Sequence, residues 1–187
     1  VLSAIERQNA SARELGEAVV MNDDVLSDLS CDLARGGSKA WHFGRGLAST
    51  SENHRATWTM LVHGLEQVAP EKRDVQVLKG FLSELWERNR ELAQYLLDAA
   101  LDQPALVVSL PLLHTALTLD DRGVARLKRS LSAGKTPIGM YRHLASGRAT
   151  EYLSGEVLKD FLLHIAQLPD GFSVAINILH MRLHLDR

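Results

Sequence analysis

The chain has 187 residues, of which 45% are hydrophobic and 24% charged, and its formal net charge is −2. This composition excludes an intrinsically disordered chain and argues against a protein that is basic over its whole surface. The single cysteine, Cys31, excludes an internal disulfide, and no apolar run reaches the ~20 residues that span a membrane. We therefore expect a soluble cytoplasmic protein with no membrane partner.

Helical spacing of apolar residues predicts four helices before residue 70. Ser11 and Glu14 match a capping box and predict that the first helix begins there. The limits of the next three helices are indicated by residues that commonly start or stop helices: Asp23, Asp24, Gly36, Gly37, Ser38 and Pro70.

The longest predicted helical stretch covers about residues 71–101, with a polar segment at 87–91 that interrupts it. Asp102 and Pro104 form a natural cap and first turn for the next helix. Pro111 breaks or kinks that helix, because proline cannot donate the backbone hydrogen bond. The middle of the chain is therefore also helical.

The C-terminal third continues the pattern. A helix restarts at residues 118–121 and stops at Gly134, and another begins at Thr136-Pro137. The last two helices are separated by a turn at residues 169–171. Aromatic residues make up only 5% of the chain, and no convincing alternating strand occurs, so the sequence predicts an all-α fold.

Two short phrases recur in the chain. Residues 77–82 (VLKGFL) are echoed by residues 157–162 (VLKDFL), and residues 45–49 (RGLAS) by residues 142–146 (RHLAS). The offset of 80 residues in the first echo is about twice the ~40-residue period of HEAT helix pairs. Chance similarity between leucine-rich helices is the alternative. We expect an irregular stack of antiparallel helix pairs, either α-solenoid-like or a helical bundle.

With these phrases the chain resembles the HEAT-like and TPR-like α-solenoid families, although the TPR consensus is absent. The segment from Leu158 to Arg182 also resembles helical regions that follow NTPase modules in large bacterial defence or signalling proteins. The second resemblance implies a sensor or scaffold region of a multidomain protein. The chain has no initial Met and ends within a helical pattern, so we expect residues 1–187 to form a single all-helical domain of a longer chain.

One segment differs from the rest of the chain in its charge. Residues 122–150 contain no acidic residue. Arg122, Arg126 and Arg129 follow helical spacing, so they are candidates for a basic ridge that binds nucleic acid or a nucleotide ligand. A solvated face balanced by acidic residues on neighbouring helices is the alternative. The candidate binding residues of the whole segment are Arg122, Arg126, Arg129, Lys135, Arg142 and Arg148.

The histidines offer a weaker hypothesis of a metal site. His180 and His184 are four residues apart, so on a helix they share one face. Asp160 and His164 have the same spacing on the preceding helix, with Glu156 one turn earlier. Such pairs are common on helix surfaces, and we expect no metal or other cofactor in this protein.

Other catalytic patterns fail. Residues 134–136 (GKT) resemble the end of a phosphate-binding loop, but the glycine that this motif needs is replaced by Arg129, and no strand precedes it. Cys31 lies among leucines and is expected to be a packed residue. Trp41, Trp58 and Trp86 are expected in the core.

We therefore expect a non-enzymatic helical scaffold that binds a protein partner or an adjacent domain of the same polypeptide. Binding of nucleic acid or a nucleotide ligand through residues 122–148 is the first alternative. A metal-dependent helical enzyme is the second.

Overall fold

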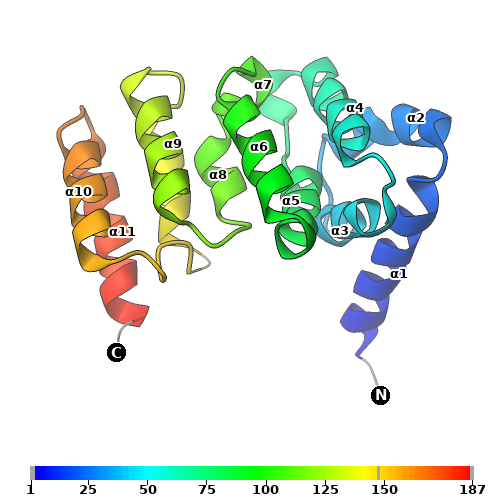
Figure 1. The fold of residues 1–187 in the computed structure, drawn as a ribbon, viewed down its shortest axis with the longest axis horizontal. Helices are drawn as coiled ribbons and strands as arrows, with labels where there is room; N and C mark the ends of the chain where they lie inside the picture. Colours follow the sequence, from blue (N-terminus) through cyan, green and yellow to red (C-terminus); the bar gives the residue numbers. More distant parts are fainter. Residues whose placement is uncertain (1–2, 147, 186–187) are drawn as a thin grey trace. The chain divides into compact units, whose positions relative to one another are not determined.

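The computed structural model describes residues 3–146 and 148–185, and every regular element in them is a helix (Figure 1). The predicted all-α fold is confirmed. The sequence predicts one domain, and within it the structure distinguishes two compact units, residues 1–96 and 97–187. We call these unit 1 and unit 2 and describe each by itself.

Unit 1 contains five α-helices and one 3-10 helix among its described residues, and a sixth α-helix begins in it and ends in unit 2. The elements are α1 (Ala4–Val19), α2 (Asp23–Leu33), α3 (Ala40–Thr50), α4 (His54–Gln67), η1 (Pro70–Lys72), α5 (Gln76–Arg88) and α6 (Arg90–Ala100). The break between α5 and α6 at Asn89 confirms the predicted interruption at residues 87–91.

Two predicted helix starts were wrong. The capping box lies at Ser3 and Glu6, whose side chains each accept a hydrogen bond from the backbone N–H of the other residue, so Ser11 lies within α1. The helix begins earlier because residues 4–10 contain no helix breaker. The cap of α2 is Asn22, which accepts from the N–H of Val25, and the acidic residues at 23 and 24 occupy the first turn.

The core of unit 1 is built around α3, which packs closely against α1 on one side and α5 on the other (Figure 1). A Cβ atom on Gly46 would lie 2.0 Å from the carbonyl oxygen of Arg13 in α1. A Cβ atom on Gly44 would lie 2.0 Å from the carbonyl oxygen of Val77 in α5. The two helix crossings therefore require glycine, because any side chain there would force the backbones apart.

A buried carboxylate connects the same three helices. The side chain of Glu84 in α5 is 4% exposed and accepts hydrogen bonds from Arg13 (2.9 Å), Arg45 (2.9 Å) and Arg88 (2.9 Å). Burial alone raises the pKa of Glu84, but these hydrogen bonds and the charges of Arg13 and Arg45 outweigh it and hold the pKa below its ordinary value. Glu84 thus has a structural role in the packing of unit 1.

Among its described residues, unit 2 contains the end of α6 and six further elements: α7 (Pro104–Val107), α8 (Leu110–His114), α9 (Asp121–Ser132), η2 (Ile138–Ala145), α10 (Gly155–Ala166) and α11 (Gly171–Leu185). Pro111 lies in the first turn of α8, so the predicted break of the helix is confirmed. Gly134 has a φ of 64° and ends α9, as the sequence predicts.

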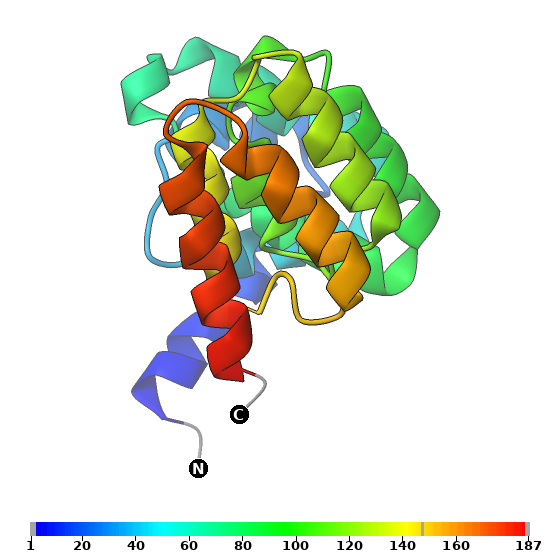
Figure 2. The same cartoon turned by 90° about the vertical axis from the view of Figure 1, so that its left-hand side faces the viewer.

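The core of unit 2 lies among α9, η2, α10 and α11. The buried hydroxyl of Tyr141 in η2 donates to the carbonyl oxygen of Leu127 in α9 (2.9 Å), and its ring lies 6.4 Å from that of Phe161 in α10. Figure 2 shows α10 and α11 side by side, and both helices contact further elements of the unit on their inner side.

Candidate functional site

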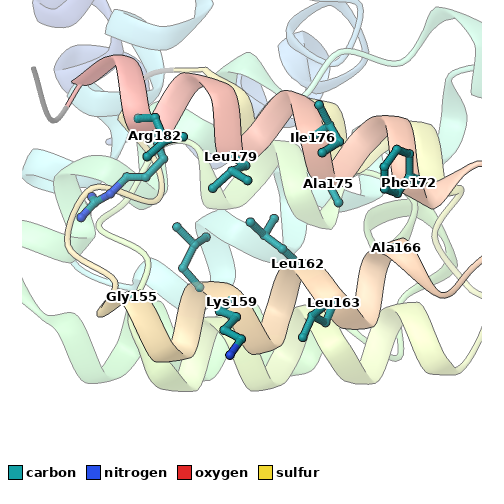
Figure 3. A pocket seen from close by; sticks show the side chains of 12 residues that line it. Gly155, Lys159, Leu162, Leu163, Ala166, Phe172, Ala175, Ile176, Leu179 and Arg182 are labelled. Carbon is teal, nitrogen blue, oxygen red and sulfur yellow. The ribbon is translucent and has the colours of Figure 1, made fainter.

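An apolar groove with a volume of about 380 Å³ lies between α10 and α11 (Figure 3). The two helices run antiparallel, and the buried side chains of Leu162 and Ala175 form the floor of the groove. Leu163 lies on the outer edge of α10, while Phe172 and Ile176 line the α11 side. The groove is open to solvent along the outside of the helix pair.

Apolar residues cover two faces of α11, and only one of these faces is packed. Val174 and Ile178 are fully buried against the rest of unit 2. A helix with apolar residues on all sides is ordinarily buried on all sides. Here the second face carries apolar side chains whose exposed fractions lie between 37% and 68%: Phe172, Ile176, Leu179 and Leu183. This face therefore lacks a packing partner within the described part of unit 2.

Local sequence signals position the two walls of the groove. The hydroxyl of Ser154 accepts from the N–H of Val157 and starts α10. The turn into α11 places Asp170 at a φ of 60°. A Cβ atom on Gly171 would lie 1.9 Å from the carbonyl oxygen of Ile165, so glycine is required for the chain to reverse this tightly.

The only charged residues among the described groove residues are cationic. Lys159 is exposed on the α10 side and makes no ion pair within the described chain. Arg182 lies at the end of the groove near Gly155, where its guanidinium donates to the carbonyl oxygens of Thr150 and Glu151. The groove thus combines an apolar floor with positive charge toward one end.

The structure buries one residue of the predicted basic ridge and pairs a second with the same carboxylate. Arg126 lies on α9 but is 2% exposed, and it donates to the carboxylate of Asp98 through Nε (2.9 Å) and Nη2 (2.7 Å). Arg122 donates to the other oxygen of the same carboxylate (2.6 Å). Burial raises the pKa of Asp98, but the hydrogen bonds from both arginines outweigh it and lower this pKa below its ordinary value. Arg126 is thus part of the core rather than of a surface ridge.

His114 lies beside Arg126, with its Nε2 atom 3.3 Å from Nη1 of the arginine. Because a guanidinium only donates, Nε2 accepts and the imidazole proton lies on Nδ1. Burial of the ring, helped by the charge of Arg126, lowers the pKa of His114 to about 3. The histidine is therefore neutral at physiological pH, a feature that the sequence analysis did not find because no local pattern marks it.

Three of the remaining basic candidates each bind a different partner. Lys135 donates to the carbonyl oxygen of Leu101 (3.1 Å), Arg142 to the hydroxyl of Ser173 (3.4 Å), and Arg148 to the carboxylate of Glu151. Arg129 is exposed on α9. Binding of nucleic acid or a nucleotide ligand by this segment stays a prediction.

The metal candidates do not meet. Asp160 pairs with Lys128, and His164 lies 3.2 Å from the hydroxyl of Ser132. His180 and His184 stack on one another along α11, with ring centroids 6.4 Å apart. Among residues 3–146 and 148–185, no group of three or more His, Cys, Asp or Glu side chains lies close enough to hold a metal ion.

The GKT segment has a structural role. Thr136 is buried, and its hydroxyl donates to the carbonyl oxygen of Val107 (2.6 Å). This hydrogen bond fixes the segment between α9 and η2 onto α7. The hydroxyl is therefore engaged in the core of unit 2.

The tryptophans divide into two kinds. Trp58 is buried, as predicted. Trp41 and Trp86 are half-buried, and the cationic groups of Lys79 and Arg90 lie over their rings at 5.7 Å and 4.4 Å. The expectation that all three lie in the core was wrong for these two, because a ring near the surface is also stabilised by a cation.

The sequence predicts the last two helices but not the groove between them. A signal was present in the spacing of Phe172, Ile176, Leu179 and Leu183, which repeats at four, three and four residues beside the buried set of α11. This spacing indicates a second row of apolar residues on a helix whose first row is already buried in unit 2.

Comparisons with protein-family models, with curated proteins and with solved structures found no match to this chain. Within the described residues, no helix is long and apolar enough to cross a membrane.

Proposed function

We propose that this chain is a non-enzymatic helical scaffold that binds a partner protein through the α10–α11 groove. The observation that carries the proposal is the second apolar face of α11, which remains exposed while Val174 and Ile178 on the first face are fully buried. Contiguous exposed apolar surface on a folded protein typically marks a site of interaction. Full burial of a leucine or phenylalanine side chain contributes about 1.5–3 kcal/mol, so covering this face provides a substantial driving force.

The groove fits binding better than catalysis. A catalytic site gathers polar groups with shifted pKa values in an accessible cavity. Here the most strongly shifted histidine, His114, is fully buried beside Arg126, and the groove is lined by aliphatic and aromatic side chains with cations toward one end. This distribution supports a binding surface.

The arrangement of unit 2 also supports the proposal that the chain is an α-solenoid-like scaffold. In such proteins each antiparallel helix pair buries one face against its neighbour in the stack. The α10–α11 pair has one packed side and one open side. A helix pair with an open side can pack against a further helix. We extend the proposal to a scaffold region of a larger cytoplasmic protein.

Selection from a displayed library of helical peptides tests the proposal. Enriched peptides are expected to bind the full chain, and chemical-shift changes on binding are expected to map to α10 and α11. Ile176→Glu should abolish binding, because it places a charge in the apolar groove. Leu15→Glu is the matched control, since Leu15 is also an exposed apolar residue but lies on α1 in unit 1.

Two results would contradict the proposal. One is that no peptide is enriched above the background of an unrelated helical protein. The other is that the selected peptides bind Ile176→Glu as tightly as the original chain.

A further inference from the structure

Resting on the proposed function, we infer that the partner segment is an amphipathic helix of about three turns whose flanks carry acidic residues. Three observations define this partner: the length of the open face, the spacing of its apolar side chains, and the sign of the charges beside it.

The open face has the dimensions of a short helix. Phe172 and Leu183 are the first and last exposed apolar residues of α11 along the groove, and eleven residues of helix rise by about 16 Å. A partner helix of about three turns covers this length. The groove is concave between two helices, so it matches the curved side of a third helix better than a flat surface.

The apolar side chains are spaced for helix-to-helix packing. On α11 the exposed residues follow the four-three-four spacing of a coiled-coil seam. On α10 the groove residues Gly155, Lys159, Leu162 and Ala166 repeat at the same intervals, with the cationic Lys159 as the one charged member of the row. Two such rows side by side form holes that accept the apolar side chains of a third helix, placed at every third or fourth position.

The charges beside the groove select an acidic partner. Lys159 and Arg182 are the charged residues among the described groove residues, and both are cationic. Glutamate or aspartate on the flank of a partner helix reaches Lys159, because both side chains lie at the rim of the same interface. A second copy of this chain would instead bring the same cations to its own side of the contact.

Two exposed acidic residues flank Lys159 on α10. Asp160 is paired with Lys128, whereas Glu156 weakens the preference for an acidic partner. Glu156 is exposed on α10, three residues before Lys159, and is outside the groove lining. Its negative charge opposes an acidic partner. Removal of this charge in Glu156→Gln is therefore expected to increase the affinity for an acidic helix.

The experiment uses one model peptide of about 14 residues with leucines in a heptad pattern, made in three versions that carry Glu, Gln or Lys at the flanking positions. Affinity is measured by fluorescence anisotropy with the full chain at low and high salt. We expect the Glu peptide to bind about three- to tenfold more tightly than the Lys peptide at low salt, and the difference to shrink as salt is added.

Charge-reversal variants test whether Lys159 causes the preference for the Glu peptide. Lys159→Glu should invert the order of the Glu and Lys peptides, and Glu156→Gln should strengthen binding of the Glu peptide. Lys72→Glu is the matched control: it makes the same charge change at an exposed lysine of η1 in unit 1, and it should leave the order unchanged.

The outcomes separate this inference from the proposed function. If all three peptides bind equally and Ile176→Glu abolishes their binding, the groove binds a helix but the acidic partner is wrong. If no peptide binds and the chain forms a dimer that Ile176→Glu dissociates, a second copy occupies the groove and the inference is overturned. Binding only to anionic lipid vesicles would overturn both proposals.

Discussion

The α1–α3–α5 core of unit 1 and the α10–α11 pair of unit 2 show opposite uses of helix packing. In unit 1, α3 is enclosed by two neighbours at crossings so close that glycine is required on its surface. In unit 2, α11 has packed one apolar face and left an equally apolar face open. The difference indicates that the first region maintains the fold, while the second leaves an apolar face exposed, which is the face that a partner would bury under our proposal.

The two regions also differ in how their charged groups are paired. Glu84 draws arginines from all three core helices of unit 1 to one buried carboxylate. The α10–α11 groove has no comparable network among its described residues, and Lys159 at its rim makes no ion pair there. A surface that binds a partner benefits from such unused charge, since the partner can supply the opposite sign.

The largest expected effect comes from the glycine crossing. Gly44→Ala places a Cβ atom 2.0 Å from the carbonyl oxygen of Val77, so α3 and α5 must move apart. We expect a loss of about 3 kcal/mol in the free energy of unfolding, measured by urea denaturation. Gly139→Ala is the control, because a Cβ atom there meets nothing within 4 Å. An unchanged urea midpoint for Gly44→Ala would show that the crossing is loose.

Neutralising the buried carboxylate should have the next largest effect. Glu84→Gln leaves the arginines beside an uncharged side chain and is expected to cost about 2 kcal/mol, less than for a fully buried pair because the arginines are partly exposed. Glu87→Gln changes a more exposed partner of Arg45 and should change stability by at most about 0.5 kcal/mol. Equal effects of the two substitutions, measured by thermal unfolding, would contradict a special role for Glu84.

Acidification should weaken unit 2 before unit 1. The folded-state pKa of His114 is lowered from 6.5 to about 3, so the unfolded chain binds a proton that the folded chain excludes. This contribution is fully present above pH 6.5 and is lost as the pH falls toward 3, at about 1.4 kcal/mol per pH unit at most. The lowered pKa of Glu84 causes a loss only as the pH falls below its ordinary value of 4.5.

Hydrogen exchange of the two units at pH 7 and pH 5.5 checks this order. Amides of unit 2 should lose more protection than those of unit 1, and His114→Gln should remove the difference. His42 in unit 1 also has a lowered pKa, because burial and the charges of Lys39, Arg45 and Arg13 disfavour its protonation. Since that ring is only half-buried, its contribution should be smaller. An equal loss of hydrogen-exchange protection in both units would contradict the prediction that unit 2 weakens first.

The smallest expected effect concerns the groove itself. Phe172→Ser removes a side chain that is 68% exposed, so the free energy of unfolding should change by no more than about 0.5 kcal/mol. Phe161→Ala, at a fully buried position of α10, should cost about 3–5 kcal/mol. If Phe172→Ser destabilised the chain by a similar amount, the open face of α11 would already be part of the core.

Local patterns predicted much of the helical architecture. Pro111, Gly134 and the turn at residues 169–171 each mark a helix boundary, because their effect on the backbone is set within a few residues of sequence. The same reasoning placed the N-terminal cap at Ser11 rather than Ser3. It failed there because two capping signals lie in one helical segment, and the reciprocal hydrogen bonds of a capping box form at Ser3 and Glu6.

The sequence by itself determined the all-α class and most helix boundaries, since helix periodicity, caps and breakers act over a few residues. Tertiary structure decided which charges are available. Arg126 shares the helical spacing of Arg122 and Arg129, yet only its burial against Asp98 and His114 removes it from the surface. Tertiary structure likewise decided that one apolar face of α11 is packed and the other open, because periodicity shows that a face is apolar but not whether a neighbour covers it.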